Sequence, residues 1–183
     1  ISKEHGIIKN VYFLACGGSL VDLYPGYYFV RAESAVMDAQ WIPAREFALT
    51  PPKKLGKDSL LIICSHSGKT KECLEAAKVG MDAGAAVVTM THAPGSPCDC
   101  EEWISVVYDW APGVKEAQKP QGIVLDILNE LMKAQEPGYT LYNSIKEGFE
   151  KIDDIIAEAV KKQQNSAWLF AEKYYEEPNL YIM

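Results

Sequence analysis

Two stretches of apolar residues in this chain each lead into a short turn of glycine and hydroxyl residues, and then into a helical pattern. The apolar runs are residues 11–14 and 59–64, and the turns that follow them are residues 15–19 and 65–70. A turn of this kind leaves backbone N–H groups unsatisfied at the start of a helix, where the helix dipole also favours an anion. Because parallel strands have their carboxyl ends at one sheet edge, we expect both turns to bind the same phosphate group.

Strand and helix patterns alternate along the chain up to about residue 135. Besides the two apolar runs, strands are expected at residues 35–39, 85–91 and 104–108. Helices are expected at residues 20–31, 43–47, 71–83 and 123–134. Pro25-Gly26 should interrupt the first of these helices, because proline removes a backbone donor. The alternation predicts an α/β fold in which a parallel sheet is sandwiched by helices, a three-layer αβα arrangement like that of flavodoxin.

The last third of the chain contains a long amphipathic pattern. A helix is expected over residues 142–164. Apolar side chains recur there every three or four positions, at Ile145, Phe149, Ile152, Ile156 and Val160. A helix of this kind packs against the core of its own domain, against another domain or against another subunit.

These patterns divide the chain into three parts. Residues 1–135 form the expected phosphate-binding domain, and residues 136–178 form a C-terminal helical segment that packs on the core or on a partner domain. Residues 179–183 are interpreted as the start of a truncated second domain, because residues 180–183 resemble the apolar run at 11–14.

Composition excludes several classes of function. The net charge of −7 and the lack of a basic stripe argue against nucleic-acid binding. No apolar run is long enough to span a membrane, and the first residues are too polar for a signal peptide. The five cysteines include one close pair, Cys98-Asp99-Cys100, without the second ligand pair of a metal site. We therefore expect reduced thiols, a cytoplasmic location, and neither a metal nor a cofactor.

The order and spacing of three segments resemble the SIS (sugar isomerase) family of phosphosugar-binding domains. These segments are Cys16-Gly17-Gly18-Ser19, residues 65–70 and residues 84–91, and the resemblance covers residues 8–135. Residues 11–17, 44–47 and 68–70 are most similar to the fructoselysine-6-phosphate and glucoselysine-6-phosphate deglycases. The synthase that makes glucosamine 6-phosphate typically has Thr, Gln and Glu where this chain has Gly18, His66 and Lys69.

The resemblance implies a set of site residues. The hydroxyl groups expected to donate to the phosphate belong to Ser19, Ser65, Ser67 and Thr70. The backbone N–H groups expected to complete the site belong to Gly17, Gly18, Gly68 and Lys69. The residues expected to contact the sugar are His66, Glu116 and Lys119. His66 is favoured as a contact over a catalytic base, and His5 and His92 as surface or loop residues. No catalytic residue is assigned, because the acid–base residues of these enzymes lie in a second SIS domain.

The leading hypothesis is one domain of a deglycase or isomerase that acts on a 6-phosphorylated Amadori compound such as fructoselysine 6-phosphate. Enzyme activity is then expected of the full-length protein and is left open for this chain alone. One alternative is an aldose–ketose isomerase with a single SIS domain, or the isomerase domain of a glucosamine-6-phosphate synthase. A second is a regulatory module that senses a phosphosugar. The expected partners are a phosphorylated sugar or sugar–amine conjugate and further copies of the chain, as a homodimer or a higher oligomer.

Overall fold

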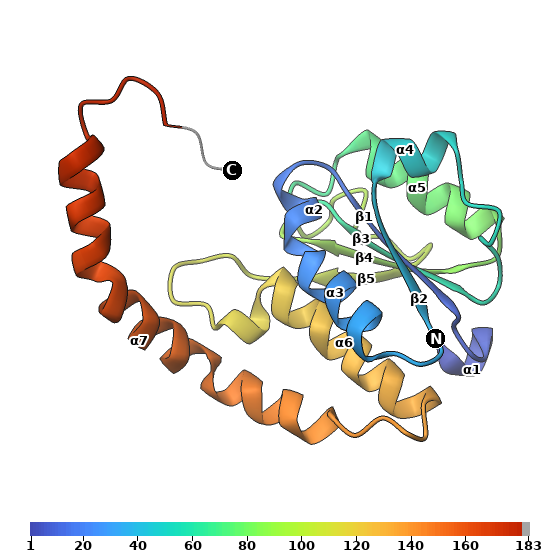
Figure 1. Ribbon diagram of the computed structural model, residues 1–183. Helices are drawn as coiled ribbons and strands as arrows, with labels where there is room; N and C mark the ends of the chain where they lie inside the picture. The colour runs from blue at the N-terminus through green and yellow to red at the C-terminus, as the bar shows by residue number, and fades with distance from the viewer. Residues whose placement is uncertain (181–183) are drawn as a thin grey trace.

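A computed structural model describes residues 1–180, so the predicted strand at residues 180–183 lies outside the described residues apart from Leu180. Within them, five parallel strands form one sheet in the order β2-β1-β3-β4-β5 (Figure 1). The strands are β1 (Asn10–Ala15), β2 (Asp38–Pro43), β3 (Ser59–Cys64), β4 (Ala86–Thr91) and β5 (Ile104–Val107). The predicted parallel α/β sheet is confirmed.

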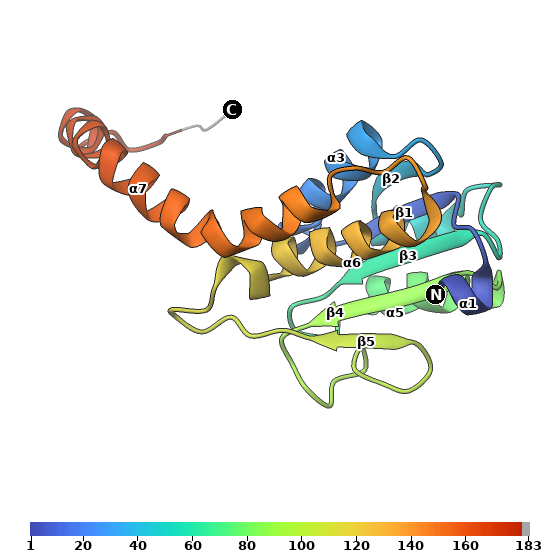
Figure 2. The ribbon, with the colours of Figure 1, turned by 90° about the horizontal axis from the view of Figure 1, so that it is seen from below.

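Helices cover both faces of the sheet, which makes the predicted three layers (Figures 1 and 2). One face is covered by α2 (Gly18–Asp22), α3 (Tyr24–Glu33) and α6 (Pro120–Gln135). The other is covered by α4 (Ala44–Leu49) and α5 (Lys71–Asp82). Short helices α1 (Ser2–His5) and η1 (Glu116–Gln118) and the long helix α7 (Tyr142–Tyr174) complete the described chain.

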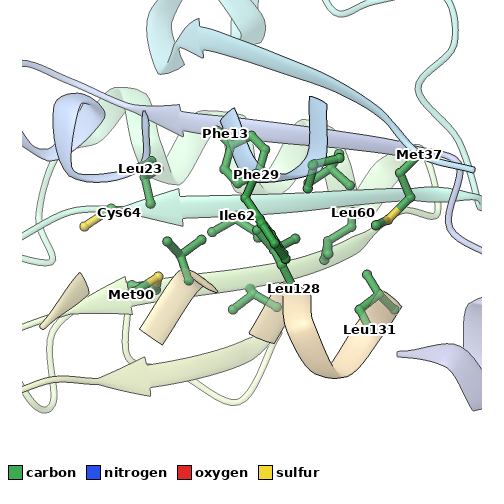
Figure 3. Packing of buried hydrophobic residues seen from close by; sticks show 14 of the residues in the cluster. Phe13, Leu23, Phe29, Met37, Leu60, Ile62, Cys64, Met90, Leu128 and Leu131 are labelled. Atoms are coloured by element: carbon green, nitrogen blue, oxygen red, sulfur yellow. The ribbon is translucent and has the colours of Figure 1, made fainter. Parts of the chain in front are cut away.

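Side chains of β1 and β3 alternate between two hydrophobic clusters, one on each face of the sheet. Phe13 and Ile62 belong to the cluster beneath α3 and α6, whereas Leu14 and Leu61 belong to the cluster beneath α4 and α5. Figure 3 shows the first cluster, in which Phe13 and Ile62 lie close to Leu128 of α6. All six residues of each strand are buried, which explains why both runs are apolar without interruption.

Three elements differ from the sequence-based expectation, and the simplest difference is that α7 ends at Tyr174 and not at residue 164. The second strand, expected at residues 35–39, occupies Asp38–Pro43, because the segment before it is held in a turn. There the Ser34 hydroxyl accepts the N–H groups of Val36 and Met37, and the buried Glu136 carboxylate accepts the N–H of Ala35. The helix expected at residues 20–31 is divided at Leu23 into α2 and α3, consistent with the predicted interruption near Pro25.

The long helix α7 packs on the core only over its first part. Lys146 forms ion pairs with Asp126 and Glu130 of α6, and Asp153 accepts the backbone N–H of Glu116 at 3.0 Å. Beyond these contacts the helix extends away from the sheet (Figures 1 and 2), and Val160 at the end of the predicted apolar stripe is 65% exposed. None of the described helices is both long and apolar enough to cross a membrane.

Candidate functional site

The two glycine- and serine-containing turns begin side by side at the carboxyl edge of the sheet. Ala15 at the end of β1 is the register partner of Cys64 at the end of β3. Burial raises the pKa of the Cys64 thiol to about 12, and an interaction with the Ser19 hydroxyl of the first turn partly offsets this effect. The parallel register therefore places the start of the first turn next to the end of β3, where the second turn starts.

Hydroxyl groups in the second turn have two different roles. Ser65 is buried and its Oγ donates to Oγ1 of Thr70 at 2.8 Å, which closes the loop between β3 and α5. Ser67 is exposed, and its Oγ accepts the backbone N–H of Lys69 at 3.3 Å. Because that bond uses only an acceptor position of Ser67, its hydroxyl proton is available to a ligand. Thr70 is the N-cap residue of α5, so the loop also presents the start of a 12-residue helix.

One glycine in each turn has a positive φ angle. Gly17 has φ 59° and is exposed with Gly18 at the start of α2. Gly68 has φ 64° but is buried, and its N–H donates to the Ser65 carbonyl at 2.9 Å. Gly68 therefore has a structural role in the turn, while the contribution of these backbone groups and of the exposed Lys69 to phosphate binding stays a prediction.

A cluster of aromatic rings surrounds the middle residue of the second turn. His66 lies with its Nδ1 3.0 Å from the Tyr108 hydroxyl, and its ring stacks on His92 with centroids 4.9 Å apart and planes 15° apart. Trp110 meets the His66 ring edge-on at 5.8 Å. Sequence reasoning interpreted His92 only as a surface or loop residue and assigned no role to Tyr108 or Trp110. Their position directly after two strands was the available signal, since Thr91 and Val107 are register partners at the same sheet edge.

Asp22 and Gln121 form a side-chain hydrogen bond that sequence reasoning did not predict. The Gln121 side-chain amide donates to Oδ1 of Asp22 at 2.7 Å, which connects α6 to α2. Burial raises the pKa of the Asp22 carboxyl, and the nearby His66 acts in the opposite direction. A partly buried carboxylate thus lies close to the loop that carries Ser65 and Ser67.

We expect the Asp22→Asn variant to be more stable than the natural chain at neutral pH. The folded-state pKa of Asp22 is raised by burial, so the cost of holding it charged is present above that pKa. This cost disappears as the pH falls through the folded-state pKa to below the unfolded-state value. Melting temperatures of both proteins, measured from neutral to acidic pH, should therefore converge, and a pH-independent difference would contradict the assignment.

The predicted sugar-contact residues Glu116 and Lys119 lie near the aromatic cluster. They form an ion pair with each other in and beside η1. The Lys119 ammonium lies over the Trp110 ring, 5.8 Å from its centroid, and Trp110 in turn contacts His66. The structure therefore places His66 and Lys119 against Trp110, with Glu116 paired to Lys119, while the contact of these three residues with a sugar stays a prediction.

Comparison with known proteins supports the predicted fold. No family model matches the chain. It is 32% identical over 176 residues to fructosamine deglycase FrlB of Bacillus subtilis (strain 168), a match that covers 96% of this chain and 53% of the relative. A solved structure of a candidate phosphosugar isomerase from Bacillus subtilis has a TM-score of 0.87 and 30% identity, and covers 96% of this chain and 56% of that chain.

A candidate phosphosugar isomerase from Salmonella typhimurium LT2 has a TM-score of 0.85 and 32% identity, over 93% of this chain and 52% of that chain. This chain spans about half the length of the curated relative and of both solved structures. The resemblance predicted from residues 16–19, 65–70 and 84–91 is therefore confirmed: this chain has the SIS fold and is similar along nearly its whole length to part of a fructosamine deglycase.

Proposed function

We propose that this chain is the phosphosugar-binding domain of an enzyme that cleaves a 6-phosphorylated sugar–amine conjugate such as fructoselysine 6-phosphate. The observation that carries the proposal is the pairing of Ala15 with Cys64, which sets the hydroxyl groups of both turns at one edge of the sheet. The similarity to a fructosamine deglycase supports the choice of a sugar–amine conjugate.

The site is suited to a phosphate dianion. Ser19, Ser67 and Thr70 supply small hydroxyl donors, and the start of α5 adds a favourable dipole. Each hydrogen bond to a charged group contributes about 1.5–3 kcal/mol, so three or four donors hold a phosphate without an arginine. The exposed Lys69 adds a positive charge at the same loop.

The whole enzyme would open the sugar ring and then move a proton from C1 to C2 and a proton from the amine nitrogen to O2, which converts the ketoamine into an imine at C1. Water then hydrolyses this imine to glucose 6-phosphate and the free amine. In this scheme the present domain holds the phosphate and orients the sugar, and the acid–base residues belong to another part of the enzyme. Self-association of the domain, with a homodimer as the simplest form, is part of the same proposal.

Binding is tested by a thermal-shift titration of the chain with fructoselysine 6-phosphate, with unphosphorylated fructoselysine as the control ligand. Ligand at a hundredfold its dissociation constant should stabilise the fold by about 2.7 kcal/mol. For a domain of this size that corresponds to a rise of roughly 5–10 °C in melting temperature. An equal shift with the unphosphorylated sugar would contradict a phosphate site.

Replacing Ser67 by alanine should weaken binding of the phosphorylated sugar by about tenfold to a hundredfold, because one donor to a charged group is lost. The unliganded melting temperature should stay close to that of the natural chain, since Ser67 is exposed. Ser144→Ala is the matched control, because Ser144 is exposed at the start of α7, outside both turns. Equal affinities for the two variants would argue against the proposed site.

A further inference from the structure

Tyr108 lies where it can control the protonation pattern of His66. It follows β5 directly and is only 4% exposed, so its hydroxyl group is held inside the protein. That hydroxyl lies 3.0 Å from Nδ1 of His66 and 3.9 Å from Sγ of Cys64. It therefore connects a buried thiol to the ring at the middle of the proposed phosphate loop.

The direction of the hydrogen bond follows from the chemistry of these three groups. Burial raises the pKa values of both the Cys64 thiol and the Tyr108 phenol, so each keeps its proton at neutral pH. The phenol has one proton, which it can donate to the imidazole nitrogen or to the sulfur. Sulfur is a weak acceptor, whereas an unprotonated imidazole nitrogen is a good one. The stronger arrangement has Tyr108 donating to Nδ1 of His66, with the proton of His66 on Nε2.

The His92 ring stacks on one face of the His66 ring and restrains it. Nδ1 of His92 lies 3.1 Å from the backbone carbonyl oxygen of Tyr108. A carbonyl only accepts, so His92 carries its proton on Nδ1 and its orientation is determined by the backbone. The stacking of the two imidazoles at 4.9 Å and the edge of Trp110 at 5.8 Å then limit rotation of the His66 ring.

We infer that Tyr108 and His92 are positioning residues that hold His66 as the Nε2–H tautomer, so that His66 serves as a hydrogen-bond donor to an oxygen atom of the sugar phosphate. His66 is exposed between the buried Ser65 and the exposed Ser67, at the loop proposed to bind phosphate. A ring nitrogen whose partner nitrogen is already engaged presents a defined donor to a ligand. The identity of the ligand rests on the proposed function, whereas the tautomer does not.

The tautomer is measured in the unliganded chain by long-range ¹H–¹⁵N correlation spectra after ¹⁵N-histidine labelling, at a pH where the rings are neutral. The chain contains only three histidines, which makes assignment practical. We expect His66 to show a protonated Nε2 and an unprotonated Nδ1, and His92 to show the reverse. A protonated Nδ1 on His66 would overturn the inference and leave the proposed phosphate binding intact.

Tyr108→Phe tests the role of the hydroxyl with the ring retained. In this variant His66 should show a mixture of tautomers, whereas His92 should keep its protonated Nδ1, because its acceptor is a backbone atom. Unchanged spectra of His66 would show that Tyr108 does not control the ring. His92→Ala should likewise loosen the His66 ring, and a single sharp Nε2–H pattern in that variant would remove His92 from the inference.

Measurements of fructoselysine 6-phosphate binding show whether His66 donates a hydrogen bond to the ligand or has only a structural role. Tyr108→Phe and His66→Ala should each weaken binding by roughly threefold to tenfold, the effect of one hydrogen bond. His66→Gln should restore most of the affinity lost in His66→Ala, because its side-chain amide is also a donor. No rescue by glutamine would overturn the donor role. Failure of the natural chain to bind the ligand would instead overturn the proposed function and the donor role, but not the tautomer.

Discussion

Gly68→Ala is expected to lower the free energy of unfolding by about 2–5 kcal/mol and to abolish stabilisation by the phosphorylated sugar. Gly68 has φ 64°, a conformation that costs any residue with a Cβ about 1–2 kcal/mol. A Cβ at this position would also lie within 2 Å of the Ser96 hydroxyl and 2.8 Å from Oγ1 of Thr91. The loop would have to move away from Ser96, and Ser65, Ser67 and Thr70 would move with it.

Gly84→Ala is the matched control for backbone conformation. Gly84 has φ 77°, but a Cβ added there meets no atom within 4 Å. It follows α5, far along the chain from the two turns, so this variant should lose only about 1–2 kcal/mol and keep ligand binding. Chemical denaturation and thermal-shift titration of both variants measure the difference. Equal losses of stability in Gly68→Ala and Gly84→Ala would show that the clash between the added methyl group and Ser96 contributes nothing.

Phe13→Ala should destabilise the fold by about 3–5 kcal/mol, because it removes a fully buried ring. The Phe13 ring meets Tyr27 edge-on at 6.4 Å. Gly26 of α3 lies so close that an added Cβ would be 2.9 Å from Cε1 of Phe13. Both sheet and helix would need to shift to fill the cavity. A reduction of the melting temperature by about 6–20 °C is expected for a chain of this size.

Tyr28→Ala is the control for loss of an aromatic ring from the same region. Tyr28 is in α3 but is 62% exposed, so its replacement should change stability by no more than about 0.5 kcal/mol. Ligand affinity is a useful second measurement for Phe13→Ala. Because Phe13 lies beneath α3 and not in either turn, the folded fraction of this variant should bind the phosphorylated sugar almost normally. A comparable loss of stability in Phe13→Ala and Tyr28→Ala would contradict the assignment of Phe13 to the hydrophobic core.

The predicted phosphate residues differ in what a mutation at each would reveal. Ser65, Gly68 and Thr70 shape the loop through contacts with one another and with the residues below it. Substitution of these residues therefore affects folding and binding together. Ser67 and Lys69 are exposed, so their substitution reports on the ligand more directly.

Local patterns in the sequence were sufficient for four of the five described strands, the order of the longer helices and both turns. Uninterrupted apolar runs predicted buried parallel strands, because β1 and β3 are covered on both faces. The error at β2 has a tertiary cause: Glu136, about a hundred residues away, holds the N–H of Ala35 and delays the start of the strand. The extent of α7 was underestimated for a local reason, since the apolar stripe that predicted it ends at Val160 whereas the helix continues to Tyr174.

By itself, the sequence predicted the SIS-type α/β fold and the proximity of the two turns, because both depend on short-range patterns that a parallel sheet converts into proximity. Only the tertiary structure decided which side chains surround His66. His92 follows β4, whereas Tyr108 and Trp110 both follow β5, and they meet around His66 because β4 and β5 end at the same edge in register. The Asp22–Gln121 pair likewise depends on how α6 packs beside α2. Contacts between residues so far apart along the chain leave no periodic signal, so packing alone reveals them.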